Sequence, residues 1–95
     1  MTFAFTSTLI EWRGPAPFVF APVPPDVADS LRDLAPTLSY GWGYIPASLQ
    51  VGNTQTTTAL MPRNGGYLVP IKVVIQRAEK VGPGDTVFVR LTLEV

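Results

Sequence analysis

The sequence predicts a small, mostly β fold with two short helices, and three observations support this. The 95 residues include ten prolines and eight glycines, so the elements are expected to be short and to end abruptly. The apolar runs are rich in Val, Ile, Thr, Phe and Tyr, which favours strands. Apolar side chains recur at helical spacing in two segments. A chain of this length buries one modest core, so residues 1–95 are expected to form a single domain.

The first two strands are expected at residues 2–12 and 18–23. Residues 2–12 alternate in part between apolar and hydroxyl side chains, which is typical of a strand with one buried face. Prolines 22, 24 and 25 end the second run and place it near a sheet edge. With a turn at residues 13–17, the two strands would form a loose hairpin.

A first helix is expected from Pro25 to Pro36. Proline is tolerated in the first helical turn, and carboxylates there favour the positive helix end. Val27, Leu31 and Leu34 recur at helical spacing, and Pro36 is expected to end the helix. The charged residues off this stripe are interpreted as a solvated face: Asp29, Arg32 and Asp33.

Two more strands are expected at residues 44–51 and 54–61. Pro46 interrupts the first, which predicts a bulge or bend there. Gly52-Asn53 is a turn sequence, and the strand that follows is rich in threonine. Residues 62–66 then predict a tight turn, in which Gly65 and Gly66 are interpreted as structural, before a short strand ending at Pro70.

A second helix is expected at residues 71–80, followed by a closing strand at 86–95. The helix is indicated by apolar residues spaced i, i+3, i+4 and i+7, namely Ile71, Val74, Ile75 and Ala78. Its β-branched content is poor for a helix, so tertiary packing must hold it. In the closing strand, apolar and other residues alternate without a break, with Val87, Val89, Leu91 and Leu93 on one face.

An internal repeat is indicated by the order of these elements. An offset of 49 residues lays residues 12–18 over residues 61–67, and each segment precedes a short strand, a proline and a helix. Each half, about 1–48 and 49–95, therefore reads β-β-α-β. A half this small cannot bury its apolar face alone, so the two halves are expected to close on each other as a small barrel. Because the second half is supplied internally, the chain is expected to be a monomer.

Four segments together resemble a bacterial family known only as a domain of unknown function. These are Gly41-Trp42-Gly43-Tyr44-Ile45-Pro46, Leu60-Met61-Pro62, Gly65-Gly66-Tyr67-Leu68-Val69-Pro70-Ile71-Lys72 and Val81-Gly82-Pro83-Gly84-Asp85-Thr86-Val87. The resemblance implies a double-split β-barrel, similar to the dimeric AbrB-type transcription-factor and antitoxin barrels but with both halves in one chain. It implies no activity. It also implies a structural role for Gly84 and Asp85, since the Asp side chain of this turn in AbrB-like barrels bonds turn backbone.

Composition argues against several function classes. Seven basic and seven acidic residues give a formal charge of zero, so no overall field attracts nucleic acid or anionic membranes. The chain has no cysteine and no histidine, which removes thiolate metal sites and the commonest general base. No catalytic spacing or phosphate-binding loop is present, so neither an enzyme nor a cofactor is expected. Without a leader or a membrane-spanning run, a cytoplasmic location is expected.

Two groups of residues are candidates for binding. Tyr40, Trp42 and Tyr44, separated by glycines, could line a groove for a small ligand or peptide, although core packing of Trp42 is the alternative. Four basic residues fall within 18 positions and could bind a phosphate, a carboxylate or a nucleic-acid backbone, or could simply be solvated: Arg63, Lys72, Arg77 and Lys80. The sequence thus predicts a non-catalytic binding domain for a small molecule or a protein partner. A nucleic-acid-binding regulator, by analogy to AbrB-like barrels, is the alternative, and an enzyme of unknown type is the third reading.

Overall fold

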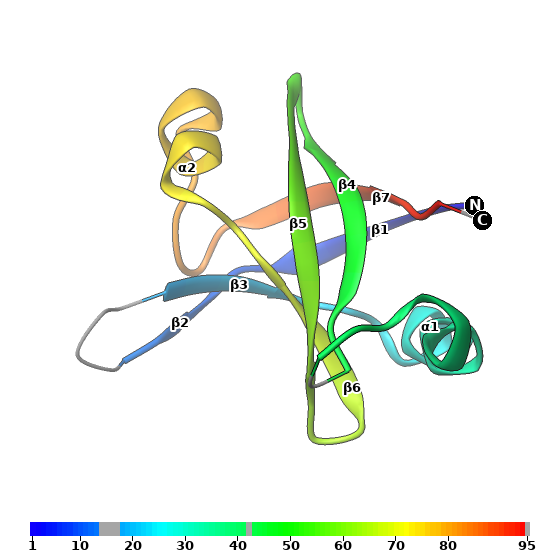
Figure 1. Cartoon of the computed structure of the whole chain (residues 1–95). Helices are drawn as coiled ribbons and strands as arrows, with labels where there is room; N and C mark the ends of the chain where they lie inside the picture. The colour runs from blue at the N-terminus through cyan, green and yellow to red at the C-terminus, as the bar shows by residue number, and fades with distance from the viewer. Residues whose placement is uncertain (14–17, 42, 95) are drawn as a thin grey trace.

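The structure is a computed structural model that describes residues 1–13, 18–41 and 43–94. Over these residues, three strands precede each of two helices and a seventh strand follows the second helix (Figure 1), which confirms the mostly β prediction. Their bounds are β1 (Thr2–Thr8), β2 (Ile10–Trp12), β3 (Phe18–Pro22), α1 (Pro25–Leu38), β4 (Ile45–Val51), β5 (Thr54–Arg63), β6 (Gly66–Pro70), α2 (Val73–Glu79) and β7 (Thr86–Thr92). The turn expected at residues 13–17 lies largely outside the described residues.

The strands form one antiparallel, curled sheet in the order β1-β7-β4-β5-β6-β3-β2 (Figure 1). The two end strands, β1 and β2, are consecutive in the chain and are separated by Leu9 alone. The strand predicted at residues 2–12 is therefore split, because β1 pairs with β7 whereas β2 pairs with β3. Strand β5 changes partners without a break, since its first part pairs with β4 and its last part with β6. The sheet is consequently barrel-like.

Leu9 marks the point at which the first strand changes partners. Its N–H donates to Asp85 O at 2.8 Å, and its carbonyl accepts from Gly84 N–H at 2.8 Å. Its side chain is buried, with 2% exposed. The turn before β7 thus supplies hydrogen-bond partners for both backbone groups of Leu9, although Leu9 belongs to neither β1 nor β2.

The element order reads β-β-α-β twice when β1 and β2 count as one strand. The two halves meet in four antiparallel strand pairs, namely β1–β7, β4–β7, β4–β5 and β3–β6. No single offset relates them: β3 begins at residue 18 and β6 at 66, whereas β2 begins at 10 and the matching part of β5 at 61. The connection after β2 is longer in sequence than the Asn64-Gly65 connection after β5.

The core follows from the alternation seen in the sequence. In β7 and directly after it, the four alternating apolar side chains are all buried, at 8% exposed or less: Val87, Val89, Leu91 and Leu93. From α1, Ala28 and Leu31 are buried, and Val27 and Leu34 pack against the core cluster. Among the described residues, no helix is long and apolar enough to cross a membrane.

Three proline and helix predictions need correction. Helix α1 continues through Pro36 to Leu38, because a proline in the last turn forgoes only one backbone hydrogen bond. Strand β4 runs through Pro46 in unbroken register with β5. Helix α2 begins at Val73, since Ile71 N–H still donates to Val19 O of β3 at 2.9 Å.

The apolar face predicted for α2 is only partly buried. Ile71 and Ile75 are in the core, whereas Val74 is 58% exposed. The helix has seven residues and packs mainly on β5. Within this short helix, Ile75 is the buried side chain, so α2 does not bury the whole apolar face that its sequence suggests.

The glycine turns have the backbone geometry that their sequences require. Asn64 and Gly65, with φ of 51° and 78°, form the two-residue connection of the β5–β6 hairpin, which matches a type I′ turn. Gly66 already pairs with Arg63 as the first residue of β6. Before β7, Gly84 has φ of 92°, and the Asp85 carboxylate accepts a 2.8 Å hydrogen bond from Gly82 N–H.

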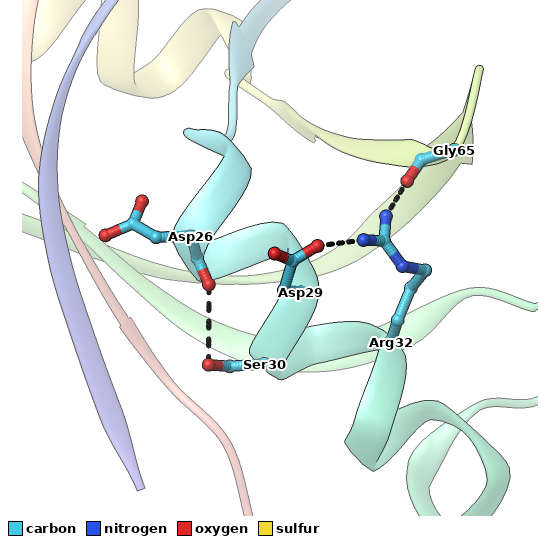
Figure 2. Close-up of polar contacts among 5 residues, drawn as sticks. All are labelled: Asp26, Asp29, Ser30, Arg32 and Gly65. Atoms are coloured by element: carbon cyan, nitrogen blue, oxygen red, sulfur yellow. Dashed lines mark hydrogen bonds and ion pairs between the residues drawn. The ribbon is translucent and has the colours of Figure 1, made fainter.

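One exposed side chain links α1 to this hairpin. Arg32 donates to the carbonyl oxygen of Gly65 and to the Asp29 carboxylate (Figure 2). Ser30, one turn away, bonds the Asp26 carbonyl at 3.5 Å. The charged face predicted to be solvated therefore also fastens the helix to the sheet.

Candidate binding surfaces

Tyr40 and Tyr44 are brought together after α1 by an isolated β-bridge. Tyr40 N–H donates to Tyr44 O at 2.9 Å, and Tyr44 N–H donates back at 3.1 Å. Tyr40 is 56% exposed. Trp42, the third residue of this predicted group, lies outside the described residues. A Cβ at Gly43 would lie 3.5 Å from the Pro62 side chain, so this turn borders the end of β5.

The four basic residues predicted as a cluster are divided between two places. Lys72, Arg77 and Lys80 lie at the start, last turn and C-cap of α2, which packs on the beginning of β5 through a Thr54–Glu79 hydrogen bond of 2.6 Å. Arg63 is the last residue of β5. Proximity in sequence therefore does not bring Arg63 to the α2 cations.

Lys72 has a defined contact. Its Nζ atom donates to the carbonyl oxygen of Thr57 at 2.7 Å. Thr57 lies in the first part of β5, which pairs with β4, and β6 pairs only with residues 61–63 further along the strand. The lysine thus satisfies a backbone acceptor of β5, and its charge stays at the surface.

A surface that the sequence reasoning missed lies on β2 and β3. We call it the aromatic face and define it as Ile10, Trp12, Phe18 and Phe20. The register pairs Ile10 with Phe20 and Trp12 with Phe18, so all four side chains lie on one side of the hairpin. Ile10, Trp12 and Phe18 are 42%, 40% and 58% exposed, above a buried Phe20. The period of two at residues 10, 12, 18 and 20 was the available signal.

Arg63 completes this surface. Its guanidinium lies over the Trp12 ring, 3.8 Å from the ring centroid, a cation–π arrangement. Trp12 and Phe18 each lie about 6 Å from Phe20, at 6.1 and 6.2 Å between ring centroids. Because a guanidinium stacked by its face still has N–H donors along its edge, Arg63 can pair with a carboxylate beside the apolar side chains.

A second surface is a polar depression on the outer side of β7, β4 and β5. It has a volume of about 390 Å³. We call it the polar depression, because all but one of its lining residues carry a hydroxyl, carboxamide or guanidinium group: Ser48, Leu49, Gln50, Gln55, Thr56, Thr57, Arg90 and Thr92. Within the described part of the chain, no group of three or more acidic side chains gathers that could hold a metal ion.

The comparisons with known proteins give a family and no function. A family model described as a domain of unknown function (DUF1905) matches residues 5–91, which is almost the whole chain. No curated protein matches the chain.

Proposed function

The chain belongs to the DUF1905 family, a domain family of unknown function, and we propose that it is a monomeric, non-catalytic domain that binds a protein partner through the aromatic face. One observation carries this proposal. The Arg63 guanidinium is stacked 3.8 Å from the Trp12 ring on a face where Ile10, Trp12 and Phe18 are each at least 40% exposed.

The chemistry of this face suits a protein partner. Tryptophan and arginine are among the residues most enriched at binding hot spots, and burial of large apolar side chains supplies most of the association energy. Stacking on Trp12 also holds the Arg63 side chain in one orientation, which reduces the conformational entropy lost on binding. The partner segment is expected to place apolar side chains on Trp12 and Phe18 and a carboxylate against Arg63.

Peptide selection can test the proposal while the natural partner is unidentified. Random peptides displayed on phage are selected on the wild-type chain and counter-selected on a Trp12→Ser/Phe18→Ser double variant. Trp12 fluorescence in a Trp42→Phe variant, where it is the single tryptophan, then reports binding. Enriched sequences are expected to combine aliphatic or aromatic residues with Asp or Glu.

Arg63→Gln should weaken such peptides by roughly tenfold or more, because a hydrogen bond between charged groups contributes about 1.5–3 kcal/mol. Arg77→Gln, on α2, is the matched control and should leave the affinity unchanged. Peptides that bind the double variant as well as the wild type would contradict the proposal. Binding confined to small aromatic acids would instead favour a small-molecule ligand on the same face.

A further inference from the structure

Cross-strand pairing aligns four hydroxyl side chains in one row. Thr2 pairs with Thr92, Thr92 with Ser48, and Ser48 with Thr57. The row therefore crosses β1, β7, β4 and β5 on the outer side of the sheet, with neighbouring strands about 4.8 Å apart. The Thr2 and Thr92 hydroxyls are 3.3 Å apart, so hydrogen bonding can run along the row.

The next row is made of carboxamides and a guanidinium. Gln55 pairs with Gln50, and Gln50 with Arg90. The Gln55 Nε2 atom donates to Gln50 Oε1 at 3.2 Å, and Gln50 Nε2 donates to Gly52 O at 3.1 Å. These bonds hold the two carboxamides in place. Apart from Thr2, the residues of both rows line the polar depression of about 390 Å³.

The lining of the polar depression carries a positive charge. Arg90 lies on its β7 side, and none of the described residues that line it is acidic. Two charged groups lie just outside this lining: the Lys72 Nζ atom is 2.7 Å from Thr57 O, and Glu94 borders a neighbouring hollow that shares Ser48 and Thr57.

From this arrangement we infer that the polar depression binds a small polyhydroxylated anion, namely a phosphate- or carboxylate-bearing sugar. A hydroxyl can both donate and accept, as sugar hydroxyls do, so Ser48, Thr57 and Thr92 complement a sugar ring. The planar fork of Arg90 complements a phosphate or a carboxylate. This site is separate from the aromatic face and does not depend on the function proposed for that face.

An NMR titration of the full chain tests the inference. Glucose 6-phosphate and glucuronate are the probes, with glucose and inorganic phosphate as controls. Because the site is open, a Kd of about 1 mM is expected, with amide shifts confined to β4, β5 and β7. Shifts with both sugar acids would assign the shared oxyanion, and shifts with one alone would identify its source as phosphate or carboxylate.

Matched variants separate this site from other surfaces. Arg90→Gln should weaken glucose 6-phosphate at least tenfold, whereas Arg63→Gln should leave it unchanged. A Ser48→Ala/Thr57→Val double variant should weaken glucose 6-phosphate but not inorganic phosphate. Melting temperatures check that each variant is folded. The variants are expected to fold, because the substituted residues lie on the outer surface of the sheet.

Several results would overturn the inference. One is the absence of shifts at about 20 mM of either sugar acid, well above the expected Kd. Others are shifts that map outside these three strands, equal binding by Arg90→Gln, or equal effects of glucose and glucose 6-phosphate. Inorganic phosphate binding as tightly as glucose 6-phosphate would show that the hydroxyl row contributes nothing.

Discussion

The side chain of Glu79, on α2, lies directly against Gly52 in the turn between β4 and β5. A Cβ atom added at Gly52 would stand 1.8 Å from Glu79 Oε1, far inside van der Waals contact. The same carboxylate accepts the 2.6 Å hydrogen bond from the Thr54 hydroxyl. This contact fastens the seven-residue helix to the β4–β5 hairpin.

Gly52→Ala is expected to destabilise the fold by about 2 kcal/mol, measured by urea denaturation. About half comes from backbone strain at the φ of 57°. The rest comes from the Thr54 hydrogen bond, which is lost when the Glu79 carboxylate moves away. In a Glu79→Ala background the same substitution should therefore cost only about 1 kcal/mol. Equal costs in both backgrounds would contradict the contact.

Gly84→Ala should lower the melting temperature, whereas Gly82→Ala in the same turn should not. Neither added Cβ would meet an atom within 4 Å, so the comparison isolates backbone strain at the Gly84 φ of 92°. A cost of about 1 kcal/mol corresponds to a shift of roughly 4–8 °C in a domain of this size. Calorimetry that gives the same shift for both variants would contradict this account.

Ser7 and Thr58 should respond in opposite ways to removal of their hydroxyls. They occupy matching positions, two residues before the buried Leu9 and Leu60. The Ser7 hydroxyl donates to Pro22 O at 2.7 Å, whereas the Thr58 hydroxyl is buried with no hydrogen-bond partner among the described residues. Ser7→Ala should cost about 1 kcal/mol, and Thr58→Val should be neutral or stabilising. Urea midpoints measure both, and a loss of stability in Thr58→Val would mean that the hydroxyl has a partner.

The wild-type chain is expected to show no retention of duplex DNA in a gel-shift experiment at low ionic strength. The net charge is zero, and Arg63 is separated from the three cations of α2. Low salt maximises the electrostatic term, so failure there is decisive. Retention that disappears when Lys72, Arg77 and Lys80 are changed to Ala would instead support the nucleic-acid alternative.

Local patterns in the sequence were sufficient to predict most of the fold. The alternation from Val87 to Leu93 predicts a strand with one buried face, and that face is buried. The break at Leu9 has no local signal, because it depends on β1 pairing with β7, which lies at the opposite end of the chain, while β2 pairs with β3. The extension of α1 past Pro36 was also missed, because a proline ends a helix less strictly when it falls in the last turn.

The binding surfaces were harder to predict, since they join residues that are distant in sequence. Arg63 was grouped with Lys72 by proximity in the chain, yet its observed contact is with Trp12 on another strand. The polar depression requires the pairing of β7 with β4, which connects Arg90 to Gln50. Register of this kind is fixed only once the whole sheet is assembled.

The position of β7 between β1 and β4 has a consequence for synthesis of the chain. Strand β1 is made before the other strands, but its hydrogen-bonding partner is the last of them to leave the ribosome. During elongation, β1 therefore presents an unpaired strand edge with Phe3 and Phe5 attached, a situation that promotes association between nascent chains. Pairing of β1 with β7 requires contacts of high sequence separation, such as Thr2 with Thr92, and contacts of this kind slow folding.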